Sequence, residues 1–146
     1  MKGCLMAGEL QKAVLMADDD EEDCLLATEA FLETGVKAVF SCVRDGIELM
    51  DHLSECMLRD PKGQPDLILL DLNMPRKDGR EALVEIKSNP ALQHLPIIIL
   101  TTSKQEKDID FITKAGAKSF ITKPATFDGW VEIMRSLGKE WLNTQA

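Results

Sequence analysis

The feature that most constrains the fold is a regular alternation of short apolar runs with amphipathic stretches of helical spacing. The apolar runs cover residues 13–16, 38–43, 67–70, 97–100 and 120–121. Short apolar runs separated by helices are typical of βαβ units, in which helices cover both faces of a parallel sheet. The sequence therefore predicts an α/β fold with five strands and five helices.

Local signals place several element boundaries. Two capping boxes, in which side chains satisfy the first amide groups of a helix, predict helix starts near Gly46 and Lys104. They are formed by Asp45 with Glu48 and by Ser103 with Glu106. The last helix is expected from about Phe127, where apolar residues recur at spacings of three and four. Proline and glycine predict loops over residues 59–66 and 89–96.

Composition excludes several classes of function. A chain of 146 residues is long enough for one domain with its own core. Its net charge of −8 disfavours binding to nucleic acid or to an anionic membrane, since both need clustered basic residues. The sequence has no apolar span or signal segment, so we expect a soluble, cytoplasmic protein.

The four cysteines show no pattern of a metal or redox site. They are Cys4, Cys24, Cys42 and Cys56, without a CxxC pair or a nearby histidine at ligand spacing. We expect them to be buried or unreactive thiols.

Polar residues with complementary chemistry follow four of the five predicted strands. Asp18 and Asp19 follow the first, Asp71 the third, Thr101 ends the fourth and Lys123 follows the fifth. In open parallel sheets, ligands bind beyond the carboxyl ends of the strands. We therefore expect these side chains to share one crevice.

Such a crevice has a clear chemical use. Two carboxylates about 4 Å apart repel by about 4 kcal/mol at an effective dielectric near 20, so the cluster needs protons or a cation. Few oxygen ligands, with room for water, suit Mg²⁺. A carboxylate beside the metal can attack phosphorus, while a hydroxyl and an ammonium group neutralise the phosphoryl oxygens. Alternatively, these acids only cap a helix, the role we expect for Asp20.

Four segments, taken in order, carry a family resemblance that spans residues 12–142. They are VLMADDDEED, DLNMPRKDG, PIIILTTS and AGAKSFITKP. Together they resemble the receiver domain of response regulators. The resemblance implies a doubly wound, flavodoxin-like (βα)5 fold with strand order 2-1-3-4-5. It also implies a receiver domain at 12–146 after an N-terminal extension at 1–11.

The resemblance implies the role of each site residue. Asp71 accepts a phosphoryl group from a phosphohistidine of a sensor histidine kinase. Thr101 and Lys123 bind the transferred group, and family members usually have a cis bond at the position of Lys123–Pro124. Phe120 lies where the family carries a switch aromatic, although simple packing explains a phenylalanine there equally well.

The resemblance also assigns a metal site. Asp19 binds Mg²⁺ directly and Asp18 binds it through water, Asp71 is a further ligand, and Asn73 supplies its backbone carbonyl.

The implied output is a change in partner binding, because no DNA-binding or catalytic segment is evident. The chain resembles single-domain regulators paired with bacterial phytochromes, so such a phytochrome is the expected kinase. The fourth helix, fifth strand and fifth helix form the expected contact surface, including for a second copy of the chain. No contact with nucleic acid or membrane and no enzymatic activity of its own are expected.

Two alternatives use the same residues. Phosphatases of the dehalogenase type also use an aspartyl nucleophile, but they need a second acid where this chain has Asn73. A pseudo-receiver binds partners without phosphorylation, and the complete set of acids, threonine and lysine disfavours it.

Overall fold

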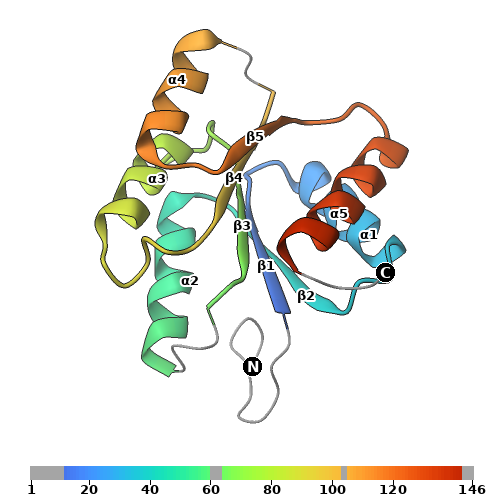
Figure 1. The fold of residues 1–146 in the computed structure, drawn as a ribbon, viewed down its shortest axis with the longest axis horizontal. Coiled ribbons are helices and arrows are strands. Elements are labelled where there is room, and N and C mark those ends of the chain that lie inside the picture. Colours follow the sequence, from blue (N-terminus) through green and yellow to red (C-terminus); the bar gives the residue numbers. More distant parts are fainter. Residues whose placement is uncertain (1–11, 60–63, 103–104, 143–146) are drawn as a thin grey trace.

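The computed structural model describes residues 12–59, 64–102 and 105–142. Within these ranges five strands alternate with five helices, as predicted (Figure 1). In chain order they are β1 (Lys12–Ala17), α1 (Glu21–Glu33), β2 (Ala38–Val43), α2 (Gly46–Arg59), β3 (Leu67–Leu70), α3 (Gly79–Ser88), β4 (Ile97–Thr101), α4 (Glu106–Ala115), β5 (Ser119–Thr122) and α5 (Phe127–Trp141). None of these helices is long and apolar enough to cross a bilayer. The expected extension at 1–11 lies outside the described residues.

The strands form one parallel sheet in the order β2-β1-β3-β4-β5. This is the order that the resemblance implied. β3 and β4 are buried along their whole length, which explains their unbroken apolar runs. From β1 the chain adds β2 on one side and β3 on the other, so the direction of the crossovers reverses between β1 and β3.

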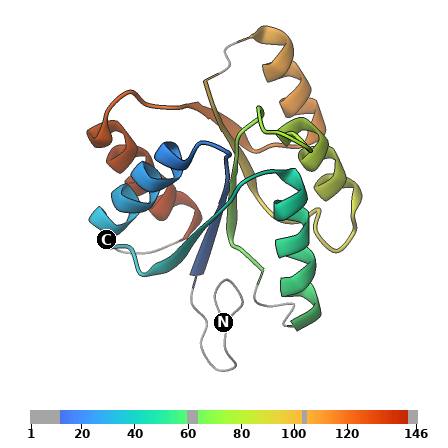
Figure 2. The same cartoon turned by 180° about the vertical axis from the view of Figure 1, so that it is seen from behind.

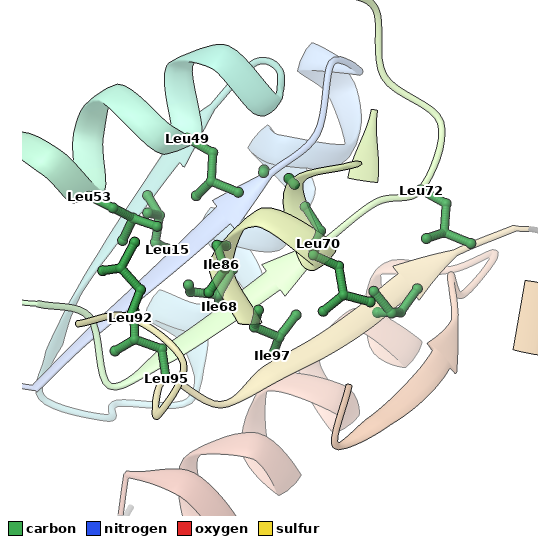
Figure 3. Close-up of a cluster of buried hydrophobic side chains, with 14 of the residues drawn as sticks. Leu15, Leu49, Leu53, Ile68, Leu70, Leu72, Ile86, Leu92, Leu95 and Ile97 are labelled. Atoms are coloured by element: carbon green, nitrogen blue, oxygen red, sulfur yellow. The ribbon is translucent and has the colours of Figure 1, made fainter. Parts of the chain in front are cut away.

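Each face of the sheet packs against its own set of helices (Figures 1 and 2). On one face, Leu15, Ile68 and Ile97 belong to a core that includes residues of α2, α3 and α4, shown in Figure 3. On the other face, Leu69 and its neighbours pack against α1 and α5. Trp130 of α5 is buried in this second core. The alternation of side chains along each strand thus builds two cores.

At the start of α2, one of the two hydrogen bonds of the predicted capping box is present. Asp45 Oδ1 accepts a hydrogen bond from the backbone N–H of Glu48 at 2.9 Å. The reciprocal bond reaches one residue further, because Glu48 Oε1 accepts from the backbone N–H of Arg44 at 2.8 Å. The helix begins at Gly46, as expected.

The predicted start of α4 is wrong by two residues. The helix begins at Glu106 instead of Lys104, because Gln105 takes the extended backbone conformation of an N-cap, with φ −71° and ψ 133°. The Gln105 side chain makes no capping hydrogen bond. The proposed cap, Ser103, lies outside the described residues, as does Lys104.

The start of α3 brings a helix against the end of β3. Asp78 and Glu81 form a reciprocal capping box, which was not among the predicted ones. The backbone N–H of Gly79 donates to the carbonyl oxygen of Leu72 at 3.0 Å. A Cβ atom on Gly79 would lie only 2.1 Å from the carbonyl oxygen of Asp71. Only glycine fits this approach.

We therefore expect Gly79→Ala to lower the free energy of unfolding by about 3 kcal/mol or more, because the methyl group overlaps backbone atoms of Asp71 and Leu72, which follow β3. Gly35→Ala is the control. Gly35 has φ 75° but no heavy atom within 4 Å of an added Cβ, so its substitution costs only about 1 to 2 kcal/mol of backbone strain. Urea unfolding of both variants measures the difference. Equal losses would contradict the importance of this close approach.

Candidate functional site

The predicted site residues lie at the carboxyl edge of the sheet. Asp18 and Asp71 follow β1 and β3, which are hydrogen-bonded neighbours. Thr101 is the last residue of β4, and Lys123 follows β5. Asp18, Asp71 and Thr101 are buried, although all three are polar. Burial of several polar groups at one edge indicates a functional constraint, because packing alone disfavours it.

The ammonium group of Lys123 contacts three carboxylates. Its Nζ lies 2.7 Å from Asp18 Oδ2, 2.8 Å from Asp23 Oδ2 and 3.3 Å from Asp71 Oδ2. Asp18, Asp71 and Lys123 thus converge, as expected. Asp23 was not predicted, because it lies in the first turn of α1 among other acids and no sequence signal separates it from a capping residue.

Three acids are arranged as ligands of a divalent cation. Asp18, Asp19 and Asp71 each offer a carboxylate oxygen, and these oxygens all lie within 4.8 Å of one another. Oδ2 of Asp18 is buried, and its partner in the described part of the chain is the ammonium group of Lys123 at 2.7 Å. Carboxylate oxygens are hard donors whose further lone pairs can bind a cation such as Mg²⁺ or Mn²⁺.

Electrostatics at the site favours the uptake of positive charge. Burial raises the pKa of Asp18 to about 6, because the hydrogen bond from Lys123 offsets only part of the desolvation. Burial lowers the pKa of Lys123, but its hydrogen bonds to Asp18 and Asp23 and the charge of Asp71 raise that pKa more. Lys123 therefore stays charged, and a single ammonium group faces several carboxylates.

Backbone hydrogen bonds hold the acids in place. Asp18 Oδ1 accepts from the backbone N–H of Asp20 at 3.0 Å. Asp20 in turn caps α1, accepting from two backbone N–H groups of the first turn, as predicted. The backbone N–H of Asn73 donates to Asp71 Oδ1 at 3.4 Å. These bonds order the carboxylates before any ligand arrives.

The loop between β3 and α3 is tied to the start of α2. Arg76 has φ 63°, an uncommon value for a residue with a side chain, and its Nε donates to Asp45 Oδ2 at 2.7 Å. The backbone N–H of Gly46 donates to the carbonyl oxygen of Lys77 at 2.8 Å. These contacts fix the loop that follows Asp71, and sequence reasoning did not find them because the partners are far apart in the chain.

The remaining predicted residues lie as follows. The carbonyl oxygen of Thr101 accepts from the backbone N–H of Lys123 at 3.0 Å, which joins the ends of β4 and β5. Phe120 lies on β5 and is 36% exposed.

The Lys123–Pro124 bond is trans, since the described chain has no cis peptide bond. The expected cis isomer is therefore corrected to the one that bonds before proline intrinsically prefer.

A cavity of about 620 Å³ borders the site between α3 and α4. Asn73 lies on its rim, beside Arg80 and Phe111. Arg80 also bridges the two helices, because its Nη2 donates to Asp108 Oδ1 at 2.8 Å. The acidic cluster is thus next to a surface hollow.

Comparison with known proteins identifies the family. Residues 14–135 match the response regulator receiver domain. The response regulator Rcp1 of Synechocystis sp. is 33% identical over 133 residues, which cover 91% of this chain and 90% of Rcp1. The crystal structure of the phosphorylated cyanobacterial phytochrome response regulator RcpA is 37% identical, with a TM-score of 0.82, and the match covers 93% of this chain and 97% of RcpA. The Mn²⁺-bound form of Rcp1 has a TM-score of 0.79 at 32% identity, covering 92% of this chain and 97% of the other. The chain therefore belongs to the response regulator receiver domain family and works in phosphorylation-dependent signalling.

Proposed function

We propose that Asp71 accepts the phosphoryl group, from a phosphohistidine of a sensor histidine kinase. The observation that carries this proposal is the contact of Asp71 Oδ2 with Lys123 Nζ at 3.3 Å, inside a cluster of metal-binding character. Among the relatives, RcpA is named as a phytochrome response regulator. This supports a bacterial phytochrome as the kinase for this chain.

The chemistry follows from the groups at the site. An oxygen of the Asp71 carboxylate attacks phosphorus, so that an O–P bond forms while the P–N bond of the donor breaks and the imidazole nitrogen leaves with the electron pair. Lys123 turns from Asp23 toward a phosphoryl oxygen and neutralises its charge. The hydroxyl group of Thr101 donates to a second phosphoryl oxygen.

Mg²⁺ is the cation that we propose for the site. Asp18, Asp19 and Asp71 supply carboxylate oxygens, and Asn73 supplies its backbone carbonyl oxygen. The Mn²⁺-bound form of the relative Rcp1 supports a divalent cation in this family. When bound, the ion offsets the negative charge of the acids and of the phosphoryl group.

The phosphoryl group then shifts a conformational equilibrium. It adds negative charge at the ends of β3 and β4, and Lys123 and Thr101 move toward it. Since Lys123 directly follows β5, its movement is transmitted to Phe120, which is only partly buried. We propose that repacking of Phe120 changes the surface formed by α4, β5 and α5.

To test the acceptor, the chain is incubated with Mg²⁺ and a small acyl phosphate, and its intact mass is measured. We expect wild type to gain one phosphoryl group and Asp71→Asn to gain none, because an amide is a poor nucleophile.

Asp78→Asn is the matched control for this experiment. Asp78 is a carboxylate in the same loop, and asparagine preserves its role as the cap of α3. It should be phosphorylated like wild type. An adduct that persists in Asp71→Asn would overturn the assignment.

Lys123 also competes with a metal for the acids, because its Nζ lies within 3.3 Å of two proposed ligands, Asp18 and Asp71. We expect Lys123→Met to lower the melting temperature of the metal-free protein and to tighten Mg²⁺ binding by about tenfold or more. Isothermal titration measures the affinity. Lys139→Met, an equal charge change on the exposed side of α5, should bind Mg²⁺ like wild type. Equal affinities of the two variants would argue against this competition.

Three exposed phenylalanines support the α4, β5 and α5 surface as a contact site for a second copy of the chain. Phe111, Phe120 and Phe127 are 36% to 40% exposed, one on each element. Exposed large apolar side chains on these three elements favour association.

We expect the phosphorylated wild type to dimerise and Phe111→Glu to stay monomeric, as measured by size exclusion with light scattering. Leu58→Glu, at an 87% exposed leucine of α2, is the control and should still dimerise. If Phe111→Glu dimerises as well as this control, the interface lies elsewhere.

A further inference from the structure

Two cysteine side chains meet beside the acidic cluster. Cys24 lies in the second turn of α1, and Cys42 lies near the end of the edge strand β2. The two thiols interact, which raises the pKa of Cys24 and lowers the pKa of Cys42. Sγ of Cys24 also lies 3.6 Å from the backbone oxygen of Asp18, to which it donates. Neither cysteine has a role in the phosphoryl transfer proposed above.

The fold places the two side chains on facing surfaces. Cys24, Thr28 and Phe31 share one face of α1 through their helical spacing, and Phe31 contacts Phe40 of β2 with ring centroids 5.1 Å apart. Cys42 is two residues after Phe40 and therefore points to the same side of the sheet. The Thr28 hydroxyl donates to the carbonyl oxygen of Cys24 at 2.7 Å and also lowers the pKa of Cys42, so Thr28 lies beside both residues. Three neighbouring contacts thus agree that α1 and β2 hold the thiols together.

We propose that Cys24 and Cys42 form an oxidisable dithiol, which a peroxide converts into an intrachain disulfide. Cys42 is exposed on the edge strand and is the sulfur that a peroxide reaches first, whereas Cys24 is half-buried. The Cys24 and Thr28 side chains beside it lower the pKa of Cys42, which favours its thiolate.

The reaction balances with one peroxide molecule. The Cys42 sulfur attacks a peroxide oxygen, the O–O bond breaks, and a sulfenic acid and water form. The Cys24 sulfur then attacks the Cys42 sulfur, the S–O bond breaks and a second water leaves. Two thiols are oxidised to one disulfide, and the peroxide is reduced to two waters.

The disulfide joins the start of α1 to β2 next to residues that contact Lys123. Cys24 directly follows Asp23, whose carboxylate contacts Lys123 Nζ at 2.8 Å. Oxidation removes the thiol proton that Cys24 donates to the Asp18 carbonyl. The disulfide therefore changes contacts that position Asp18 and Asp23, without contacting Asp71.

Peptide mapping of the full chain after treatment with hydrogen peroxide tests this inference. Remaining thiols are blocked before digestion. We expect a peptide in which Cys24 is linked to Cys42, an intact mass lower by about 2 Da, and reversal by dithiothreitol. Cys24→Ser and Cys42→Ser should each lose the linked peptide, while Cys56→Ala, at a buried position on α2, should keep it. The oxidised wild type should also melt at a higher temperature than the reduced form, because the cross-link restricts the unfolded chain.

Oxygen addition without a linked peptide, a disulfide between two chains, or a linked peptide that survives in Cys42→Ser would each overturn the inference. Asp71→Asn should form the disulfide like wild type, so this experiment succeeds or fails independently of the proposed phosphoryl acceptor.

Discussion

The repulsion between buried carboxylates at the ends of neighbouring strands is the constraint on which the site depends. Asp18 and Asp71 are close because β1 and β3 are adjacent in the sheet. Lys123 crosses from the end of β5 to contact both, and it offsets part of their repulsion. Burial keeps the pKa of Asp18 raised, at about 6, because the hydrogen bond from Lys123 offsets only part of the desolvation. The remaining negative charge attracts a cation. The cation then reduces the repulsion between these acids and a phosphoryl group.

Contacts outside the cluster keep this arrangement in place. Gly79 lets α3 start directly against the backbone of Asp71, and Arg76 bonds to the carboxylate of Asp45 at the start of α2. The loop after Asp71 is therefore fixed at both ends by backbone conformation and by a neighbouring helix. A rigid loop keeps the nucleophile oriented, which lowers the entropic cost of reaction. Lys123 is the group that can move, since its long side chain has several alternative partners.

Much of the fold could be predicted from the sequence because its strands are short, apolar and followed directly by polar residues. The acids, Thr101 and Lys123 stood out for that reason. The strand order came from the family resemblance, since local patterns do not determine which strands are neighbours. Asp23 could not be distinguished from the capping acids around it. The pair of Cys24 and Cys42 was equally hidden, because only the packing of α1 on β2 brings the two thiols together.

A crystal structure of the chain with Mg²⁺ and beryllofluoride, which mimics a phosphoryl group on a carboxylate, tests the central claim most directly. Our account predicts beryllofluoride on a carboxylate oxygen of Asp71, and Mg²⁺ on the carboxylates of Asp18 and Asp19. It also predicts that Lys123 Nζ exchanges its contact with Asp23 for one with a fluorine atom. Beryllofluoride on another carboxylate, or Lys123 still held by Asp23 beside an occupied Asp71, would contradict it.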